Sequence, residues 1–197
     1  MKYFLDTEFI ESSERKTIDL ISIGIVAEDG RKYYAISEEF DESLASEWVK
    51  DNVLSKLPSH PQSFNPVEAS PRQVSESKAW KSRATIKQEI LEFVVAGNGP
   101  IQFWAAWAAY DWVVFCWIFG DMIDLPEGYP YYCNDIIQWL NLLGLPREFL
   151  PPDSDNAHNA LADAQWVKES YYSLKKYSDN HDRRRSDSKP AELKDGR

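Results

Sequence analysis

The sequence predicts an α/β layer fold with a central mixed β-sheet. Three runs rich in β-forming residues come first, an amphipathic helical segment follows, and a fourth apolar run precedes further helical segments. This order, with three strands before the first long helix and one strand between helices, is typical of helices packed on a sheet. The length of 197 residues fits one domain with a full-sized core.

Four segments have the character of strands. In Lys2–Asp6 the apolar residues are continuous, as in a buried strand. Thr17–Ala27 is rich in β-branched residues, and Arg31–Ile36 follows it after the turn Glu28-Asp29-Gly30, so these two runs predict a hairpin. Ile101–Trp104 is predicted to be a strand in the core of the sheet.

Helical spacing of apolar residues and helix-ending signals predict five helices. They cover Glu42–Lys56, Ser82–Ala96, Tyr110–Phe119, Asp135–Leu143 and Ala157–Tyr177. Gly97-Asn98-Gly99 ends the second of them. The Pro/Ser/Gln-rich stretch from Pro58 to Lys78 has weak periodicity and is expected to be a loop, an arm or a lid. Residues 178–197 are expected to form a charged, mobile tail.

The net charge of −10 restricts the function classes. Proteins that bind nucleic acid are normally basic, because neutralising phosphates supplies most of their affinity. Taken alone, the charge argues against a nucleic-acid partner and favours clustered carboxylates that hold divalent cations. Cys116 and Cys133 lack metal-ligand spacing and are interpreted as reduced, buried thiols.

Residues 100–120 are nearly long and apolar enough to span a bilayer. However, Asp111 would lie at the centre of the span, which costs about 2.5–3.5 kcal/mol on insertion scales, and no Lys/Arg cluster flanks the segment. The apolar run at the N-terminus is too short for a signal peptide. We therefore expect a soluble, cytoplasmic protein without a membrane partner.

Three motifs carry candidate chemistry. In Asp6-Thr7-Glu8 the two acids lie at alternate positions, expected at the end of the first strand, so both side chains project to one side. Asp111 is the only charged residue between Pro100 and Gly120, at the predicted first turn of a helix. An isolated acid pair is more often merely solvated, and an acid in a first turn is often only a cap.

The third motif is His158-x4-Asp163, at the start of the last predicted helix. Five residues place the two side chains about 140° apart on a regular helix. They can face one pocket if His158 lies at the less regular edge of the helix. A lone histidine at a helix start is more often a satisfied polar residue than a catalytic base.

The order of the three motifs resembles that of the DEDDh 3′–5′ exonucleases. Four stretches are most similar to the actinobacterial-type, ribonuclease AS-like 3′–5′ exoribonucleases: YFLDTEFIE, TIDLISIGIVAEDGRKYYAIS, WAAWAAYDWVVF and HNALADA. The resemblance implies a ribonuclease-H-like three-layer fold, a central mixed β-sheet flanked by helices. It covers roughly residues 1–175, so we divide the chain into an exonuclease domain over 1–177 and a flexible tail over 178–197.

The resemblance also implies an activity and its partners. The substrate would be single-stranded RNA, shortened from its 3′ end with release of nucleoside 5′-monophosphates, with a preference for adenylate-rich ends, and the enzyme would be a homodimer. Two Mg²⁺ ions would assist, with Mn²⁺ as a substitute. Asp6, Glu8 and Asp163 are the expected metal ligands, Asp6 bridging, and Asp111 ligates directly or through water. His158 is the expected general base.

Aromatic side chains close to these motifs are candidates for substrate binding. Phe9 and Trp107 are candidates for stacking on a terminal base. Both are also compatible with the core, and for Trp107 the core is slightly favoured. Lys32, Lys50 and Arg83 are candidates for phosphate contacts. The alternatives are a 3′–5′ DNA exonuclease acting on single-stranded DNA with the same site, a catalytically silent nucleic-acid-binding module, and a metal-sensing or storage protein.

Overall fold

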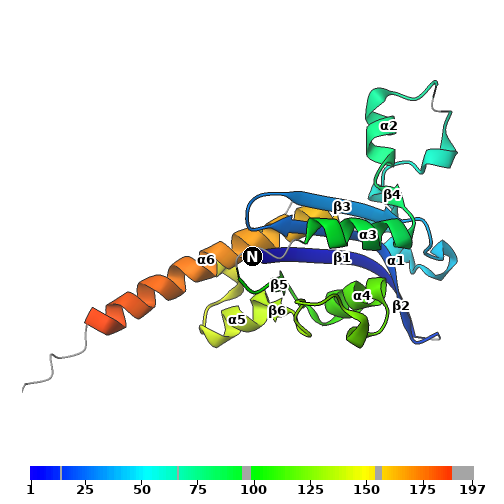
Figure 1. Ribbon diagram of the computed structural model, residues 1–197. Coiled ribbons are helices and arrows are strands. Elements are labelled where there is room, and N and C mark those ends of the chain that lie inside the picture. Colours follow the sequence, from blue (N-terminus) through cyan, green and yellow to red (C-terminus); the bar gives the residue numbers. More distant parts are fainter. Residues whose placement is uncertain (14, 66, 95–98, 154–156, 188–197) are drawn as a thin grey trace, which may run out of the picture.

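The central element is a six-stranded mixed sheet, seen in a computed structural model that describes residues 1–13, 15–65, 67–94, 99–153 and 157–187 (Figure 1). The strand order is β4-β3-β2-β1-β5-β6. The β1–β2 and β2–β3 pairs are antiparallel, and the β3–β4, β1–β5 and β5–β6 pairs are parallel. The strands are β1 (Lys2–Ser12), β2 (Thr17–Ala27), β3 (Lys32–Ser37), β4 (Trp80–Lys81), β5 (Gln102–Ala105) and β6 (Asn134–Asp135).

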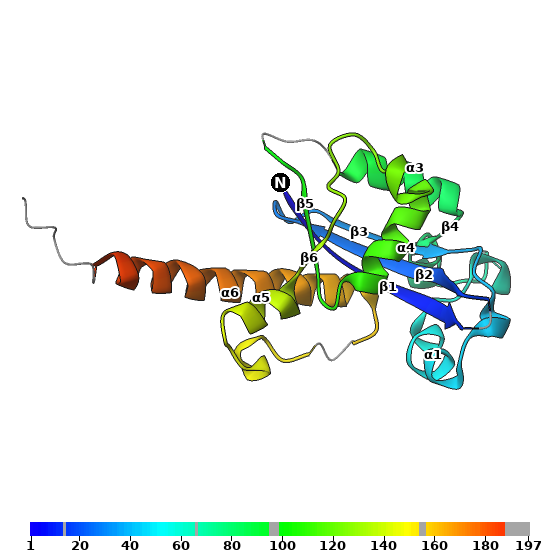
Figure 2. The same cartoon turned by 90° about the horizontal axis from the view of Figure 1, so that it is seen from below.

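Helices lie on both faces of this sheet. The α-helices are α1 (Glu47–Asn52), α2 (Pro71–Ser77), α3 (Arg83–Phe93), α4 (Ala109–Phe119), α5 (Ile136–Leu142) and α6 (Ala160–Asp187). Short 3₁₀ turns are η1 (Glu42–Leu44), η2 (Leu54–Lys56), η3 (Pro61–Ser63), η4 (Met122–Asp124) and η5 (Arg147–Phe149). In both views α6 runs along the sheet and then extends away from it (Figures 1 and 2).

Two apolar layers make up most of the core. On one face, residues of α3 and α4 such as Ile90 and Phe115 pack against Leu5 of β1. On the other face, α5 and α6 pack against Phe4 through residues that include Val167. Successive side chains of β1 therefore point into opposite apolar layers, as in any pleated strand. Helices on both faces of a mixed sheet confirm the predicted three-layer α/β fold.

The close approach of α6 to β2 depends on Gly24, which lies opposite Asp6 in the sheet. A Cβ atom at Gly24 would lie 2.2 Å from the carbonyl oxygen of Ala160, the first residue of α6. Real Cβ atoms do not approach backbone atoms so closely. Glycine at this position therefore lets the first turn of α6 lie directly over the acidic part of β1.

Several predicted boundaries need correction. The strand β1 does not end at Asp6 but continues to Ser12, because its pairing with β2 reaches Ser12 opposite Thr17. A register shift between Glu8 and Phe9 interrupts this pairing. The acid pair consequently lies in the middle of a strand, beside a β-bulge. The very short β4 and β6 were not predicted at all.

The helical predictions also differ in detail. The segment expected as one helix over Glu42–Lys56 is broken into η1, α1 and η2, since Ser46 is extended and caps α1. The segment Pro58–Lys78 is an arm that projects from the body and contains α2 (Figure 1). The last helix begins at Ala160 and continues beyond Tyr177 to Asp187. The predicted stop residues 97 and 98, and residues 188–197 of the tail, lie outside the described residues.

Within the described ranges, no helix combines the length and apolar character needed to cross a bilayer. The apolar segment at 100–120 instead forms β5 and α4. Most of its large side chains are buried in the layer between α4 and the sheet.

Candidate active site

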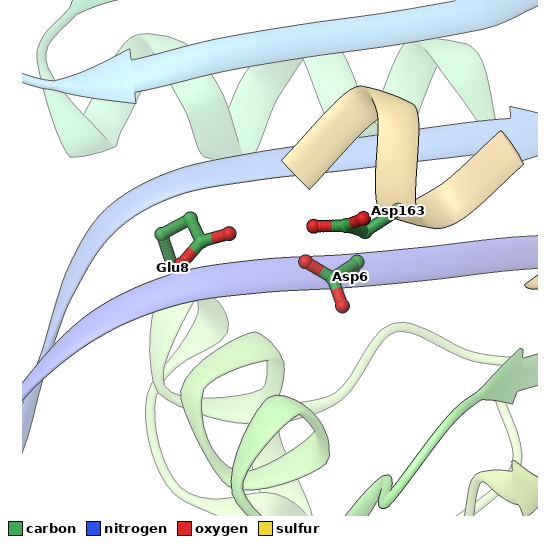
Figure 3. Close-up of side chains that lie close together, drawn as sticks. All are labelled: Asp6, Glu8 and Asp163. Atoms are coloured by element: carbon green, nitrogen blue, oxygen red, sulfur yellow. The ribbon is translucent and has the colours of Figure 1, made fainter. Parts of the chain in front are cut away.

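The acid pair and the last helix meet over β1. Because Asp6 and Glu8 are two residues apart, their side chains project from the same face of the strand. Asp163 lies in the first turn of α6, which Gly24 allows to approach that face. One carboxylate oxygen from each of the three acids lies within 4.8 Å of the other two. Figure 3 shows the three side chains converging from β1 and α6.

Asp111 reaches the same region from the other side of the strand. Its Oδ1 accepts hydrogen bonds from the Thr7 backbone N–H at 2.9 Å and from the Thr7 hydroxyl at 2.6 Å. The backbone N–H of Thr7 is available because β5 pairs only with Lys2–Phe4 and leaves the edge of β1 open beyond them. Asp111 is only 7% exposed. It therefore lies beside the three-carboxylate group without belonging to it.

Burial and mutual repulsion favour the protonated forms of these acids. Burial, and then the charges of Asp111, Glu8 and Asp163, hold the pKa of Asp6 well above its usual range. Burial chiefly raises the pKa of Glu8 to about 8, with Asp163 and Asp111 adding to it and Lys56 opposing it. Burial also raises the pKa of Asp111 to about 6, although the hydrogen bonds from Thr7 act in the opposite direction.

These acids fit a site for hard divalent cations. All of the metal-binding atoms would be carboxylate oxygens, which Mg²⁺ and Mn²⁺ prefer. A cation would offset the burial, and for Asp6 and Glu8 also the mutual repulsion, that raise the pKa values of these acids. The pKa of Asp163 is raised as well, chiefly by burial. Asp6, Glu8 and Asp163 are the residues close enough to share an ion.

His158 lies just before α6 rather than inside it. Its backbone has φ of +63°, and its N–H donates to Oδ2 of Asp163 at 2.8 Å. Asn159 caps the N-terminus of α6, since its Oδ1 accepts from the backbone N–H of Ala162 at 3.1 Å. The expected offset of 140° around a regular helix therefore does not arise, and His158 and Asp163 face the same cleft.

Two residues outside the motifs hold the chain around His158. The ring of Trp48, on α1, meets the imidazole edge to face with the centroids 4.8 Å apart. Nζ of Lys56 donates to the carbonyl oxygen of Ala157 at 2.8 Å. The α1–η2 segment thus fixes the peptide and the ring of the candidate base.

A single cleft of about 440 Å³ collects every residue that the sequence singled out for catalysis or stacking. Those residues are Asp6, Glu8, Phe9, Trp107, Asp111, His158 and Asp163. Cleft residues that were missed include Thr7, Tyr110, Asp153 and Trp166. The position of Trp166, three residues after Asp163, was a usable signal, because residues three apart share a helix face.

The two predicted stacking residues differ in exposure. Phe9 is partly buried, and its ring stacks on that of Tyr110 with the centroids 5.8 Å apart. Trp107 is 62% exposed, and its backbone has φ of +51°. Trp107 is therefore not a core residue, although the sequence is compatible with that reading.

The cations assigned to phosphate contacts do not line the cleft. Lys50 forms an ion pair with Glu47 on the same helix, and Arg83 pairs with Asp19. Lys32 is exposed at the start of β3. Lys56 is instead the cation whose charge acts on Glu8.

The fold is that of the ribonuclease-H-like class of exonucleases. Solved structures with similar folds include S. pombe Pop2p in its Mg²⁺- and Mn²⁺-bound form, with a TM-score of 0.59, 12% identity and coverage of 88% of this chain and 82% of that chain. The nuclease domain of 3′hExo, a DEDDh family member bound to rAMP, has a TM-score of 0.56 at 9% identity and covers 90% and 92%. At these identities the likeness establishes the fold.

The family follows from sequence. Residues 1–173 match the Rv2179c-like 3′–5′ exoribonuclease domain. The 3′–5′ exoribonuclease Rv2179c of Mycobacterium tuberculosis is 42% identical over 166 residues, which cover 84% of this chain and 88% of that protein. The chain belongs to the Rv2179c-like family of 3′–5′ exoribonucleases, which confirms the predicted superfamily and enzyme class.

Proposed function

We propose that this enzyme shortens single-stranded RNA from the 3′ end and releases nucleoside 5′-monophosphates in the cleft over β1. The observation that carries the proposal is the convergence of three carboxylate oxygens within 4.8 Å, in the same cleft as His158. Family membership supports RNA as the substrate, and the rAMP-bound structure of 3′hExo supports a cleft that accepts a 3′-terminal nucleotide.

Each polar residue of the cleft has a separate role in this proposal. Asp6, Glu8 and Asp163 would hold the divalent cations. When bound, the cations neutralise the phosphate, activate the attacking water and stabilise the departing ribose oxygen. Asp111, which is held by Thr7, would contact the cations directly or through water. His158 removes the proton from the attacking water as general base.

The aromatic residues orient the terminal nucleotide. The stacked pair of Phe9 and Tyr110 forms one wall of the cleft, and Trp107 lies at its exposed rim. A base–aromatic stack contributes about 1–3 kcal/mol without selecting a sequence. Stacking therefore supplies affinity that a basic groove supplies in other nucleases, which accounts for RNA binding by a chain with a net charge of −10.

The finer properties carried by the resemblance belong to the same proposal. They are a preference for adenylate-rich 3′ ends, a homodimer, and Mn²⁺ as a substitute for Mg²⁺. Exposed apolar side chains on and beside α4, including Trp117 and Ile123, support self-association. The cytoplasmic location stays a prediction, as does the division of the chain at residue 177.

One experiment tests the activity and the sugar preference. RNA and DNA oligomers of the same sequence, labelled at the 5′ end, are incubated with the enzyme in Mg²⁺, Mn²⁺ or EDTA. We expect a ladder that shortens from the 3′ end of RNA only when a divalent cation is present, and fastest on oligoadenylate tails. Cleavage of DNA in preference to RNA would favour the DNA exonuclease, since the carboxylates do not distinguish the sugars. Intact oligomers in every condition would contradict the proposal.

A further inference from the structure

A second cavity, of about 520 Å³, adjoins the candidate active site. The two cavities share Trp107 and Tyr110 in their linings. The second cavity is also lined by Tyr131 and Tyr132, which are 62% and 63% exposed. We call the surface formed by these four aromatic residues the tyrosine groove.

The walls of the groove are held together by Asp135. Its Oδ2 accepts the backbone N–H of Ala108, next to Trp107, at 2.8 Å. Its Oδ1 accepts the N–H of Ile137 at 2.7 Å and caps α5. One carboxylate thus connects the loop that carries Trp107 with the start of α5, which follows the two tyrosines in the sequence.

The lining of the groove favours flat rings over phosphates. None of the described residues that line it is a lysine or an arginine, and Asp135 is engaged in its hydrogen bonds. Tyr110 is 48% exposed and Trp107 is 62% exposed, so large aromatic surfaces face solvent. Aromatic side chains with few cations are suited to base stacking, which does not depend on sequence.

We propose that the tyrosine groove holds the bases of the nucleotides upstream of the scissile bond. The proposal rests on the proposed function, because only a 3′ end bound in the cleft over β1 sends the preceding nucleotides past the shared Trp107 and Tyr110. The groove is a second binding site, continuous with the first, and it recognises unpaired bases rather than the phosphate backbone. It gives the enzyme a means to prefer substrates of several nucleotides over isolated termini.

The test compares two RNA octamers that share their 3′-terminal nucleotide. One carries all its bases, and the other is abasic at every upstream position. For the wild-type enzyme we expect KM to be about tenfold lower for the complete octamer, equivalent to about 1.4 kcal/mol. The double variant Tyr131→Ala/Tyr132→Ala should lose most of this ratio, whereas Tyr131→Phe/Tyr132→Phe should retain it, because the rings remain.

The matched control is Tyr172→Ala, on α6. Its tyrosine is 42% exposed and lines neither cavity, and the KM ratio should stay at the wild-type value. An equal ratio in the wild type and the alanine double variant would overturn the groove while leaving the proposed function intact. A changed oligomeric state in light scattering, with an unchanged ratio, would identify the groove as a subunit contact instead. If the wild-type enzyme cleaves neither octamer, the proposed function and the groove are both rejected.

Discussion

Asp163 contributes to the site in two ways. One of its oxygens belongs to the three-carboxylate group, and its Oδ2 accepts the backbone N–H of His158. In the proposed mechanism, this one side chain thus helps to hold both the cations and the general base. Asp6 and His158 each have only one of these tasks, so substitutions at these two positions can separate metal binding from proton transfer.

Our first prediction uses that separation. His158→Ala should lower kcat by about 10²–10⁴-fold, the usual contribution of a general base, and should preserve the rise in Tm on adding millimolar Mg²⁺. Asp6→Ala should abolish most of that rise and the activity. Thermal melts with and without Mg²⁺, together with rates on labelled RNA, measure both effects. The control variant is His60→Ala, because the His60 ring packs on Trp80 outside the cleft. A wild-type Tm that does not respond to Mg²⁺ would count against the metal site.

The second prediction concerns Thr7, which lies between the two acids of the motif. Thr7→Val removes the hydroxyl that donates to Asp111 but keeps the backbone N–H that also donates to it. Because hydrogen bonds to charged groups contribute about 1.5–3 kcal/mol, the free energy of unfolding should fall by about that amount at pH 8. Urea denaturation measures the change. Thr7→Ser keeps a hydroxyl and should recover most of the loss, and an equally destabilised serine variant would refute the role of this bond.

At the scale of elements, the contact between β2 and α6 positions the site. Gly24→Ala would place a methyl group 2.2 Å from the Ala160 carbonyl oxygen. The start of α6 must then move away from β1 and carry Asp163 and His158 with it. We expect at least the 1–3 kcal/mol loss typical of overpacking, and a larger fractional loss of activity than of folded protein at 25 °C. Calorimetry and initial rates test this third prediction, and a fully active variant of wild-type Tm would contradict it.

The fourth prediction concerns α1. Trp48 packs on the His158 ring, whereas Lys50 on the same helix pairs only with Glu47 among the described contacts. Trp48→Ala should lower kcat several-fold with little change in KM, because the imidazole loses its lateral support while the stacking residues stay in place. Trp48→Phe should restore most of kcat. Lys50→Ala is the matched control on this helix, and an equal effect of both alanine variants would argue that α1 acts only through stability.

At the scale of the whole molecule, the buried acids couple stability to pH. The pKa of Glu8 is raised from 4.5 to about 8 and that of Asp111 from 3.8 to about 6. Without metal, the folded state thus binds more protons than the unfolded state. The free energy of unfolding should fall as pH rises from about 4 to about 8. The contribution of each acid is fully present below its unfolded pKa and is lost as pH passes its folded pKa.

With metal bound, the free energy of unfolding should instead rise with pH, because the cations displace the protons from the acids. Our fifth prediction is that Mg²⁺ raises Tm more at pH 8 than at pH 5.5, where the acids retain protons. Melts in EDTA and in Mg²⁺ across this range measure the difference. Glu8→Gln should flatten the profile in EDTA. A metal-free Tm that rises steadily from pH 5.5 to pH 8 in the wild type, but not in Glu8→Gln, would contradict the assignment.

Much of this arrangement could be predicted from local sequence. The run of β-branched residues located β2 correctly at Thr17–Ala27, and the three motifs identified the acids and the histidine of the cleft. The end of β1 could not be predicted, because Glu11 and Ser12 are polar and remain in the strand only through pairing with β2. The break at Ser46 was missed because capping competed with a continuous helical pattern.

The surroundings of the motifs depended on tertiary contacts. The exposure of Trp107 depends on its backbone φ of +51° and on the hydrogen bond from the neighbouring Ala108 to Asp135. The spacing of apolar residues in the sequence encodes neither feature. The contacts of Trp48 and Lys56 with residues 157–158 join distant segments. Gly24 did carry a signal, because a glycine inside a β-branched strand marks a close backbone approach.

The contact of α6 with β1 also has a consequence for the order of events during synthesis. The acid pair is made first, whereas Asp163 belongs to the last helix that packs on the sheet and His158 lies just before that helix. A nascent chain that stops before residue 158 has neither the proposed base nor the third carboxylate, and Phe4 and Val26 lack the apolar cover that α6 supplies. Closing so long a loop comes late in folding. Each copy of the enzyme should therefore become active only after residues 158–163 have left the ribosome and α6 has packed on the sheet.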